Sequence, residues 1–580
     1  MNIYQIIKDE LLDSLKLLCS RGILSHKSLE IDFSVEAPKE QALGEVSTNI
    51  ALVLSKTEKK SPRDLAELLV RELSDNDKIE RIEIAGPGFI NFIINNILWF
   101  EIMDSCLEKG PNFASVNLGK GEKVNIEFVS ANPTGPLHVG HMRGAIIGDV
   151  LANLLEFVGF SVTREYYIND AGSQIDHLTR SVYLRYLESN GEKVKFTEDL
   201  YPGDYLKNVG ELIKIKYGNS LVGSCEKDYF EKVRPLAVAE MLKLIKDDLR
   251  SINIKMDNYF SEKSLYENRT IEKTLEFLAN AGLVYQGTLP PPKGKMKEEW
   301  EEREQLLFRS TKFGDDVDRA FKKADGGWTY FAPDVSYHFD KISRGYKILI
   351  DVFGADHAGY VKRMKAAVSA LSNETLDLEV KICQLVKLFK DGMPYKMSKR
   401  AGNFILLKDV INEVGADIAR FVMLTRKNDA PLDFDFDKAL EQSKDNPVFY
   451  VQYAHARASS ILAKAETELD LEGSKKFSLK HFNLLLQMEE RNLVRLIALW
   501  PKIVESAAVK REPHRIAFYL NDLASCFHAL QHKGKINPEF RFIRVGQSDL
   551  SFARLSLVRA TKSIISKGLL LLGINPVHRM

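Results

Sequence analysis

The chain has 580 residues, of which 45% are apolar and 28% charged, as expected for a soluble globular protein of several domains. No run approaches the ~18 consecutive apolar residues of a membrane span, so we expect no membrane partner. The N-terminal stretch carries Asp and Glu in an amphipathic pattern, which argues against a secretory signal or a transit peptide. The five cysteines are scattered without a Cys-x-x-Cys pair, so we expect reduced thiols in the cytoplasm and no structural zinc.

The net charge of +1 is unevenly placed along the chain. From Val451 to Met580 there are 20 Lys and Arg against 11 Asp and Glu, a net charge of +9, so the first 450 residues carry −8. A basic tail on an acidic body suggests a polyanionic partner for the tail. A solvated basic helix face would explain the count equally well.

Residues 1–110 predict a small α+β domain. Helical spacing of apolar residues covers Tyr4–Ser20 and Ser61–Leu73, and these helices alternate with short strand-like runs. Gly86–Phe92 predicts a turn followed by a strand that holds Phe89 and an exposed Asn91. Packing within the domain is the default explanation of both side chains.

The stretch from Asn125 to Asp149 predicts a strand, a tight loop and a helix. Asn125–Ser130 is a short apolar run, and Ala131–Pro136 contains two prolines and a glycine that end it. From Leu137 onward, apolar residues recur at helical spacing. Because the first turn of a helix has free N–H groups and the positive end of the helix dipole, we expect an anion site there.

Two histidines in that first turn, His138 and His141, share one helix face. Gly140 between them would let a flat or phosphorylated ligand approach the backbone. Taken alone, the tetrapeptide is explained as well by a helix start with two surface histidines. Nothing nearby supplies further ligands at zinc spacing, so we expect no metal site.

A second strand, Ser161–Ile168, precedes another helix that starts at Asn169–Gly172. This alternation predicts a Rossmann-type parallel sheet with ligands at the carboxyl ends of its strands. Neither a G-x-G-x-x-G after a strand nor a P-loop sequence is present, so neither a dinucleotide fold nor a P-loop is supported. From about 186 to 323 the alternation stops, and we expect a mostly helical connecting insertion.

The core resumes at Gly327–Asp334 and continues with a strand at Lys347–Phe353 and a Gly-, Asp- and His-rich loop at Gly354–Tyr360. A strand at Leu378–Phe389 leads to Lys396-Met397-Ser398-Lys399, and Leu407–Thr425 predicts one helix. We therefore expect a multidomain α/β protein with an N-terminal α+β domain (1–110), a Rossmann-type catalytic domain (111–445) and a C-terminal all-α helical bundle (446–580).

His-Val-Gly-His at 138–141 and Lys-Met-Ser-Lys at 396–399 resemble the paired signatures of the class I aminoacyl-tRNA synthetases. Each follows a predicted strand, and they occur in the order typical of that class. The resemblance to arginyl-tRNA synthetases in particular covers essentially the whole chain. It is carried by Glu127–His138, Gly354–Tyr360, Lys396–Phe404, Asn446–Arg457, Gly568–Met580 and the extra N-terminal domain.

The resemblance implies ATP-dependent activation of L-arginine to arginyl-adenylate and transfer of arginine to the 3′ end of tRNA(Arg). It also implies a monomer, activation that requires bound tRNA, and Mg²⁺ as the counter-ion of ATP. Adenylation needs positioning and charge neutralisation rather than a general base, because the attacking carboxylate is already ionised. His138 and His141 would stabilise phosphate, and Lys396 and Lys399 the leaving pyrophosphate. The implied ATP contacts are His138, Gly140, His141, Lys396, Met397, Ser398 and Lys399.

The same resemblance implies an arginine site. Glu127 and Asp334 would hold the substrate guanidinium with Tyr330 beside it, since two carboxylates suit a planar fork of five donors. The other implied arginine contacts are Asn132 and His138, near the amino and carboxylate groups, and Asp356. Phe89 and Asn91 match tRNA-contacting positions, and the basic bundle resembles the anticodon-binding domain.

Two alternatives remain. The chain could be a class I synthetase for glutamate or lysine, although Glu127, Tyr330, Asp334 and the extra N-terminal domain argue against this. It could also be a catalytically silent tRNA-binding protein derived from a synthetase. The intact histidines and lysines of both signatures argue against that.

Overall fold

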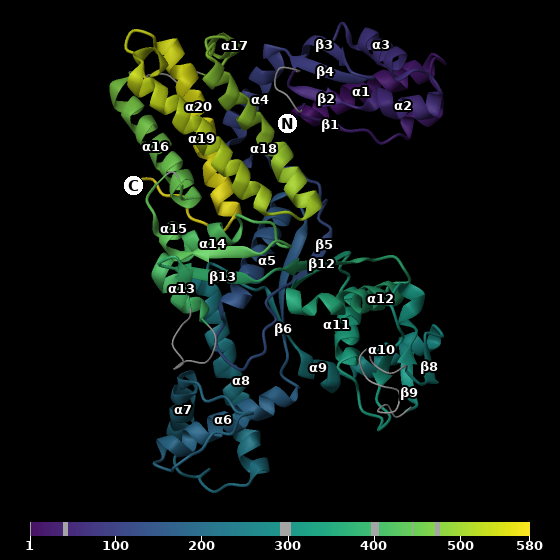
Figure 1. Cartoon of the computed structure of the whole chain (residues 1–580), viewed down its shortest axis with the longest axis vertical. Helices are drawn as coiled ribbons and strands as arrows, with labels where there is room; N and C mark the ends of the chain where they lie inside the picture. Colours follow the sequence, from purple (N-terminus) through teal and green to yellow (C-terminus); the bar gives the residue numbers. More distant parts are fainter. Residues whose placement is uncertain (1, 39–43, 290–302, 396–404, 444, 470–475) are drawn as a thin grey trace.

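The computed structural model describes residues 2–38, 44–289, 303–395, 405–443, 445–469 and 476–580. The chain runs from an N-terminal sheet with helices, through a central parallel sheet, to a C-terminal group of long helices (Figure 1). None of the helices in the described ranges combines the length and apolarity needed to cross a bilayer. The multidomain α/β class predicted from the sequence is confirmed.

The N-terminal region is an antiparallel sheet of four strands with the order β1-β2-β4-β3. Its elements are β1 (Val35–Glu36), β2 (Val46–Thr48), β3 (Ile79–Ala85), β4 (Phe89–Ile94), α1 (Ile3–Ser20), α2 (Ile50–Glu58) and α3 (Pro62–Leu73). The two predicted helices are confirmed as α1 and α3. The exposure predicted for Asn91 is wrong: this residue is 3% exposed, because β4 is an inner strand with β2 and β3 on its two sides. Phe89, at the start of β4, is 41% exposed.

The central sheet has five parallel strands in the order β12-β11-β5-β6-β7. They are β5 (Lys123–Glu127), β6 (Ser161–Ile168), β7 (Asn258–Ser261), β11 (Ile348–Gly354) and β12 (Leu378–Cys383). The predicted Rossmann-type sheet is confirmed. The first strand, β5, is central and its neighbours β6 and β11 are reached in opposite directions, so the strand order reverses there. Ligands of such sheets bind at the carboxyl ends beside this reversal.

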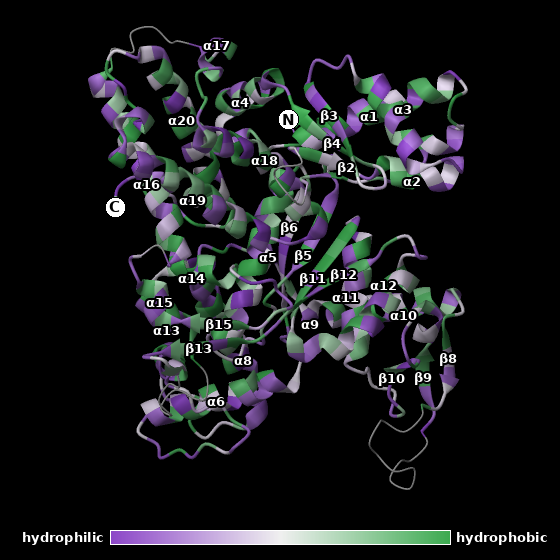
Figure 2. Cartoon of the chain, turned by 45° about the horizontal axis from the view of Figure 1, so that its top comes forward, coloured by the Kyte–Doolittle hydropathy of each residue, from purple (hydrophilic) through white to green (hydrophobic). Residues whose placement is uncertain are grey.

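Helices cover both faces of this sheet. Helix α5 (Val139–Phe157) packs against β5, β6 and β11, and a Cβ at its Gly148 would lie 2.4 Å from the Phe128 ring, so helix and sheet are very close. Helix α11 (Phe331–Ser343) lies on the opposite face with α12 (Val361–Leu371). In Figure 2 the outer helices α2 and α3 show mixed hydrophilic and hydrophobic colours.

The stretch from 186 to 323 differs from the predicted helical insertion. Helices α6 (Ser173–Ser189), α7 (Lys207–Tyr217) and α8 (Glu226–Ser251) form one helical lobe (Figure 1), but β7 then returns to the central sheet. A second lobe contains α9 (Glu262–Glu267), α10 (Thr270–Asn280) and an antiparallel sheet of β8 (Val284–Gly287), β9 (Gln305–Phe308) and β10 (Arg319–Lys322). Strands of four residues are too short to show a period of two in the sequence.

Two elements predicted as continuous are divided. Leu378–Phe389 contains β12 and β13 (Val386–Lys390), and β13 belongs to a separate sheet with β14 (Met393–Pro394) and β15 (Leu432–Asp435). Leu407–Thr425 contains α13 (Leu407–Val414) and α14 (Ala416–Met423). Gly415 separates these helices with φ +81° and ψ 160°, a conformation that a helix cannot contain.

The C-terminal bundle predicted from Asn446 onward is confirmed. It consists of α16 (Pro447–Glu468), α17 (Leu479–Phe482), α18 (Met488–Lys510), α19 (His514–Ile536) and α20 (Ser548–Leu571). The Asn446 side chain caps α16 by accepting hydrogen bonds from two backbone N–H groups. After α20 the chain reaches α14, whose buried Arg420 donates to the Leu572 carbonyl (2.7 Å) and to Asp149 of α5 (2.5 Å).

Candidate active site

The histidine signature forms the start of α5, at the carboxyl end of β5. His138 is the N-cap, and its Nδ1 accepts a hydrogen bond from the Gly140 N–H (3.1 Å). The Nδ1 of His141 accepts from the His138 N–H (3.3 Å), and the two ring centroids are 3.8 Å apart. A Cβ on Gly140 would lie 2.8 Å from the His138 ring. Glycine is therefore needed for the folded-back ring of His138, a role that the sequence did not predict.

The first-turn N–H groups of α5 are already used within the chain. Val139 donates to the Ile405 carbonyl (2.9 Å), Gly140 to the His138 ring, and His141 to the His138 carbonyl (2.9 Å). The prediction that these groups point at an anion is therefore wrong, because a capping box and a neighbouring segment satisfy them. The positive end of the helix dipole and the two imidazole rings can still attract an anion.

Both imidazoles are neutral near pH 7. Burial lowers the pKa of His138, and burial together with the His138 ring lowers the pKa of His141 to about 4. Since each Nδ1 accepts a hydrogen bond, the proton of each neutral ring is assigned to Nε2. The pair therefore offers hydrogen-bond donors rather than two positive charges. A bound phosphate would raise both pKa values.

The segment after the lysine signature lies against the histidine signature. Besides the Val139–Ile405 bond, Leu407 N–H donates to the Leu137 carbonyl (2.9 Å), and His138 pairs with Leu406 in an antiparallel bridge. Lys396, Met397, Ser398 and Lys399 themselves lie outside the described residues. Their C-terminal flank is nevertheless beside His138, although about 250 residues separate the two motifs in the sequence.

The loop between β5 and α5 is strained and anchored. Val129 has φ +70° and Ser130 φ +39°, which end the predicted strand at Glu127. Such conformations cost of order 1–3 kcal/mol each and persist only where surrounding contacts hold them. Three hydrogen bonds anchor the loop: Tyr166 Oη to the Ala131 carbonyl (2.7 Å), Tyr205 Oη to the Thr134 carbonyl (2.8 Å), and Leu137 N–H to Asp248 Oδ2 (2.8 Å).

Three buried carboxylates, the acid row, lie side by side on neighbouring strands. Asp351 of β11 is opposite Glu127 of β5, and Glu127 is opposite Glu165 of β6. Their exposures are 0%, 7% and 0%. Like charges in directly opposite positions destabilise a sheet, so this row needs compensation from outside the sheet.

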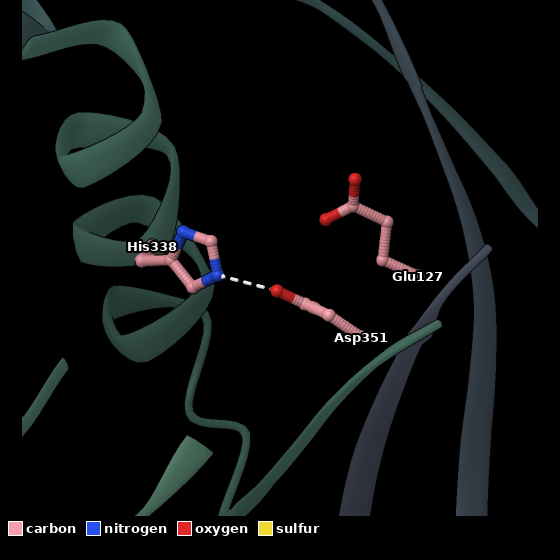
Figure 3. Close-up of side chains that lie close together, drawn as sticks. All are labelled: Glu127, His338 and Asp351. Carbon is pink, nitrogen blue, oxygen red and sulfur yellow. Dashed lines mark hydrogen bonds and ion pairs between the residues drawn. The ribbon is translucent and has the colours of Figure 1, made fainter. Parts of the chain in front are cut away.

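Helix α11 supplies that compensation with a base row at three-residue spacing, His338, Lys341 and Arg344, the last just beyond the end of the helix. Figure 3 shows the hydrogen bond between His338 Nε2 and Asp351 (3.0 Å), with Glu127 beside it. The buried Lys341 Nζ donates to Glu127 Oε2 (2.7 Å) and to Asp351 Oδ1 (3.1 Å), and Arg344 binds Glu165 through two hydrogen bonds of 2.5 and 2.7 Å.

This pairing controls the ionisation of the row. Burial would raise the pKa of Glu165, but the Arg344 hydrogen bonds and the Lys341 charge lower it to about 2. Burial likewise opposes ionisation of Asp351, but Lys341 and His338 lower its pKa. Burial dominates at Glu127, whose pKa is raised despite Lys341.

Two further acids near this row have no cation. Asp334 of α11 and Glu262, which follows β7, are paired with no Lys, Arg or His in the described ranges; we call them the cation-free pair. Asp334 accepts a hydrogen bond from Tyr360 Oη (2.5 Å). Burial raises the pKa of Asp334 to about 6, and burial followed by the charges of Asp334 and Asp170 raises that of Glu262 to about 7.

Tyr167 of β6 belongs to the same place. Its side chain is 8% exposed, and its pKa is raised by burial and then by the charges of Asp334, Glu262 and Glu127, which places the hydroxyl among these acids. This hydroxyl lies beside the Glu262 carboxylate and favours its charged form. The two acids and the phenol thus form a cluster of polar groups suited to a cation with several N–H donors.

The other predicted site residues lie outside this cluster of acids. Asn132 is exposed on the loop, and Asp356 lies on the 3₁₀ turn η7 (Ala355–Tyr360), where its charge partly offsets the lowered pKa of His141. Tyr330 precedes α11 and is 85% exposed. In this structure it therefore lies outside the buried group of acids, and the phenols that join that group are Tyr167 and Tyr360.

Glu127, His338 and Asp351 offer three ligand atoms within 4.8 Å of one another, the only such group among the described residues. Lys341 Nζ is within hydrogen-bond distance of two of them, so its ammonium takes the position of a cation. The donor set therefore does not fit a resident metal. All five cysteines are free thiols.

Sequence reasoning missed Lys341, Glu262 and Tyr167. Lys341 could have been found, because Asp334, His338 and Lys341 recur at i, i+4 and i+7 on one face of a predicted helix. Glu262 had no local signal, since the strand before it was assigned to the insertion. Tyr167 was recognised as part of a strand, but its neighbours depend on the sheet order.

Comparisons with known proteins identify the family of the chain. The model for the arginyl-tRNA synthetase N-terminal domain matches residues 2–94, that for the class I (R) tRNA synthetase catalytic domain residues 103–443, and that for the DALR anticodon-binding domain residues 451–580. The chain is 52% identical to the arginine–tRNA ligase of Ruegeria pomeroyi and 49% to that of Parvibaculum lavamentivorans, each over 100% of both chains.

The solved structure of arginyl-tRNA synthetase from Thermus thermophilus shares the fold, with a TM-score of 0.74 at 20% identity over 100% of both chains. Family models that together span most of the chain and full-length relatives thus agree on one family. The chain belongs to the arginyl-tRNA synthetase family, within class I of the aminoacyl-tRNA synthetases.

Proposed function

We propose that this chain activates L-arginine with ATP to form arginyl-adenylate and then transfers arginine to the 3′ end of tRNA(Arg), releasing AMP and pyrophosphate. The observation that carries the proposal is the cation-free pair, Asp334 and Glu262, with the hydroxyl of Tyr167 beside it. A guanidinium would bring the missing positive charge and five donors in a planar fork. Family membership supports the same substrate.

In this proposal Asp334 and Glu262 bind the guanidinium. Glu127, a member of the acid row, lies beside it. Asn132, His138 and Asp356 contact the amino and carboxylate end of arginine. Tyr330 closes over the site when arginine binds, which its exposed position before α11 permits. Lysine would leave acceptors unpaired here, and a site built on such hydrogen bonds rejects analogues by ~10⁴ or more.

ATP lies at the start of α5. His138 and His141 donate hydrogen bonds from their rings to the phosphates, and Gly140 keeps the His138 ring folded back. Lys396 and Lys399 bind the pyrophosphate end of ATP, and Met397 and Ser398 between them also contact ATP. The ionised arginine carboxylate attacks the α-phosphate, a carboxylate–phosphate bond forms, and pyrophosphate leaves with its charge neutralised. Magnesium enters with ATP as its counter-ion. The contacts of Ile405 and Leu407 with the histidine signature support joint action of the two motifs.

The tRNA is bound by the basic bundle, beginning at residue 446, and by the N-terminal domain, residues 1–110. Phe89 is exposed enough to contact RNA directly, whereas the buried Asn91 supports the surface beside it. Phosphate contacts by Lys and Arg make this binding strongly dependent on salt. We propose further that the protein acts as a monomer in the cytoplasm, where its free thiols remain reduced.

Pyrophosphate exchange with each amino acid, with and without tRNA(Arg), tests the proposal. Exchange with arginine only when tRNA is present is the expected result. Exchange with glutamate or lysine instead would refute the choice of substrate. No exchange under any condition would leave only tRNA binding, and therefore a catalytically silent protein.

A further inference from the structure

Lys341 is a fully buried ammonium between two carboxylates. Its exposure is 0%, and its Nζ lies 2.7 Å from Glu127 Oε2 and 3.1 Å from Asp351 Oδ1. The same Nζ lies 4.3 Å from the centre of the Tyr337 ring. Burial of a charge costs several kcal/mol and is tolerated only with close partners, so the charges on all three residues depend on one another.

Glu127 connects this ammonium to the substrate loop. One carboxylate oxygen, Oε2, accepts from Lys341, whereas the other, Oε1, accepts from Ser130 Oγ (2.9 Å). Ser130 Oγ in turn accepts from the Tyr167 backbone N–H (3.1 Å). Ser130 is one of the two strained residues that start the loop towards Asn132 and His138. A continuous chain of hydrogen bonds thus runs from Lys341 to this loop.

Lys341 also fixes the helix that carries Asp334. It lies seven residues after Asp334 on α11, on the same helix face, and is the central member of the base row. His338 Nδ1 is hydrogen-bonded to the Asp334 carbonyl (2.8 Å), and its Nε2 to Asp351. The ion pairs of Lys341 therefore hold Asp334 and Glu127 in one geometry.

We propose that Lys341 is a positioning residue for arginine recognition: its ammonium binds the Glu127 carboxylate and thereby holds the Glu127–Ser130 link that sets the substrate loop. This inference rests on the proposed function. The inference gives the acids of the site two different roles. Glu127 and Asp351 are neutralised by Lys341, a residue of the protein itself. The cation-free pair is left for the charge of the substrate.

Removal of the Lys341 charge would shift the ionisation of Glu127. Without it, Glu127 and Asp351 become neighbouring buried acids that share no strong cation, so Glu127 would stay protonated to higher pH. The groups that face Glu127 are Lys341, His338, Asp334 and Tyr337 from α11, Asp351 from β11, and Glu165 and Tyr167 from β6.

The test compares Lys341→Met, Lys341→Arg and Lys347→Met in pyrophosphate exchange with tRNA present. Lys347 is an exposed lysine just before β11 and serves as the matched control. We expect Lys341→Met to raise the KM for arginine at least 10-fold and the KM for ATP less than 2-fold. The acid limb of the pH profile of kcat/KM for arginine should move at least one unit upward. Lys341→Arg should keep the wild-type limb, and Lys347→Met should match the wild type throughout.

An unmoved acid limb, or equal rises in both KM values, would overturn the proposal. If Lys341→Met does not fold, Ser130→Ala tests the other end of the same chain of hydrogen bonds, at a partly exposed residue. It should raise the KM for arginine at least 5-fold with an unchanged KM for ATP, and an unchanged KM for arginine would overturn the proposal. Failure of the proposed function is distinguishable, because the wild-type protein would then show no exchange with arginine.

Discussion

The replacement Glu262→Gln should weaken arginine binding and at the same time stabilise the free protein. Glu262 is 8% exposed, has no described cationic partner, and faces Asp334. Glutamine keeps the size of the side chain but removes the buried charge. The two opposite effects follow from one cause, because the cation-free pair places negative charge in a buried position where a bound cation would neutralise it.

The size of the stability effect follows from the pKa. Burial and the Asp334 charge raise the pKa of Glu262 from 4.5 to about 7, so the folded protein holds this proton more tightly than the unfolded chain. Between pH 4.5 and 7 the folded state loses stability as pH rises, by on the order of 3 kcal/mol in total. The Gln variant escapes this loss. It should be more stable than the wild type at pH 8 by up to ~3 kcal/mol, and about equally stable near pH 4.5.

The effect on arginine has the opposite sign. A charge-assisted hydrogen bond contributes ~1.5–3 kcal/mol, so its loss should raise the KM for arginine about 10- to 150-fold while the KM for ATP stays constant. Urea unfolding at pH 5 and pH 8, together with pyrophosphate exchange, measures both effects. Glu267→Gln is the matched control on the same helix, since Glu267 is exposed and pairs with Lys263 at 3.0 Å. Unchanged stability at pH 8 and an unchanged KM for arginine would refute the reasoning.

Three other replacements test separate parts of the structure. Asp334→Asn should raise the KM for arginine at least 10-fold more than that for ATP, and equal effects on both would remove Asp334 from the guanidinium contact. His141→Asn should lower kcat of pyrophosphate exchange about 100-fold with little change in the KM for arginine, because a donor to the developing phosphate charge is lost; a wild-type kcat would contradict this role. Arg420→Met should destabilise the protein by about 3 kcal/mol in urea unfolding, because the buried Asp149 would lose its closer cation and keep only Arg164 at 3.6 Å. An unchanged midpoint would show that this contact does not hold the end of the chain to α5.

Sequence reasoning reached the arrangement of the main elements because that information is local. Proline and glycine after Ser130, apolar spacing from Leu137 and the two signatures predicted the strand, loop and helix of the site. Apolar periodicity likewise predicted α1, α3 and the C-terminal bundle. It failed where an element was short, as with β7, or where one residue changed the direction of the chain, as with Gly415 between α13 and α14.

By itself, the sequence determined which residue types stand at the carboxyl end of β5: Glu127, then a loop, then His138 and His141 at a helix start. Only the tertiary structure decided what each of them touches. The ion pair of Glu127 with Lys341 spans 214 residues, and the N–H group of Val139 is satisfied by Ile405, which follows the distant lysine motif. The spacing of apolar residues in the sequence predicts only which face of a single helix or strand is buried. Partners of charges and N–H groups depend on strand order, register and the helix that lies across the sheet, and these belong to the whole fold.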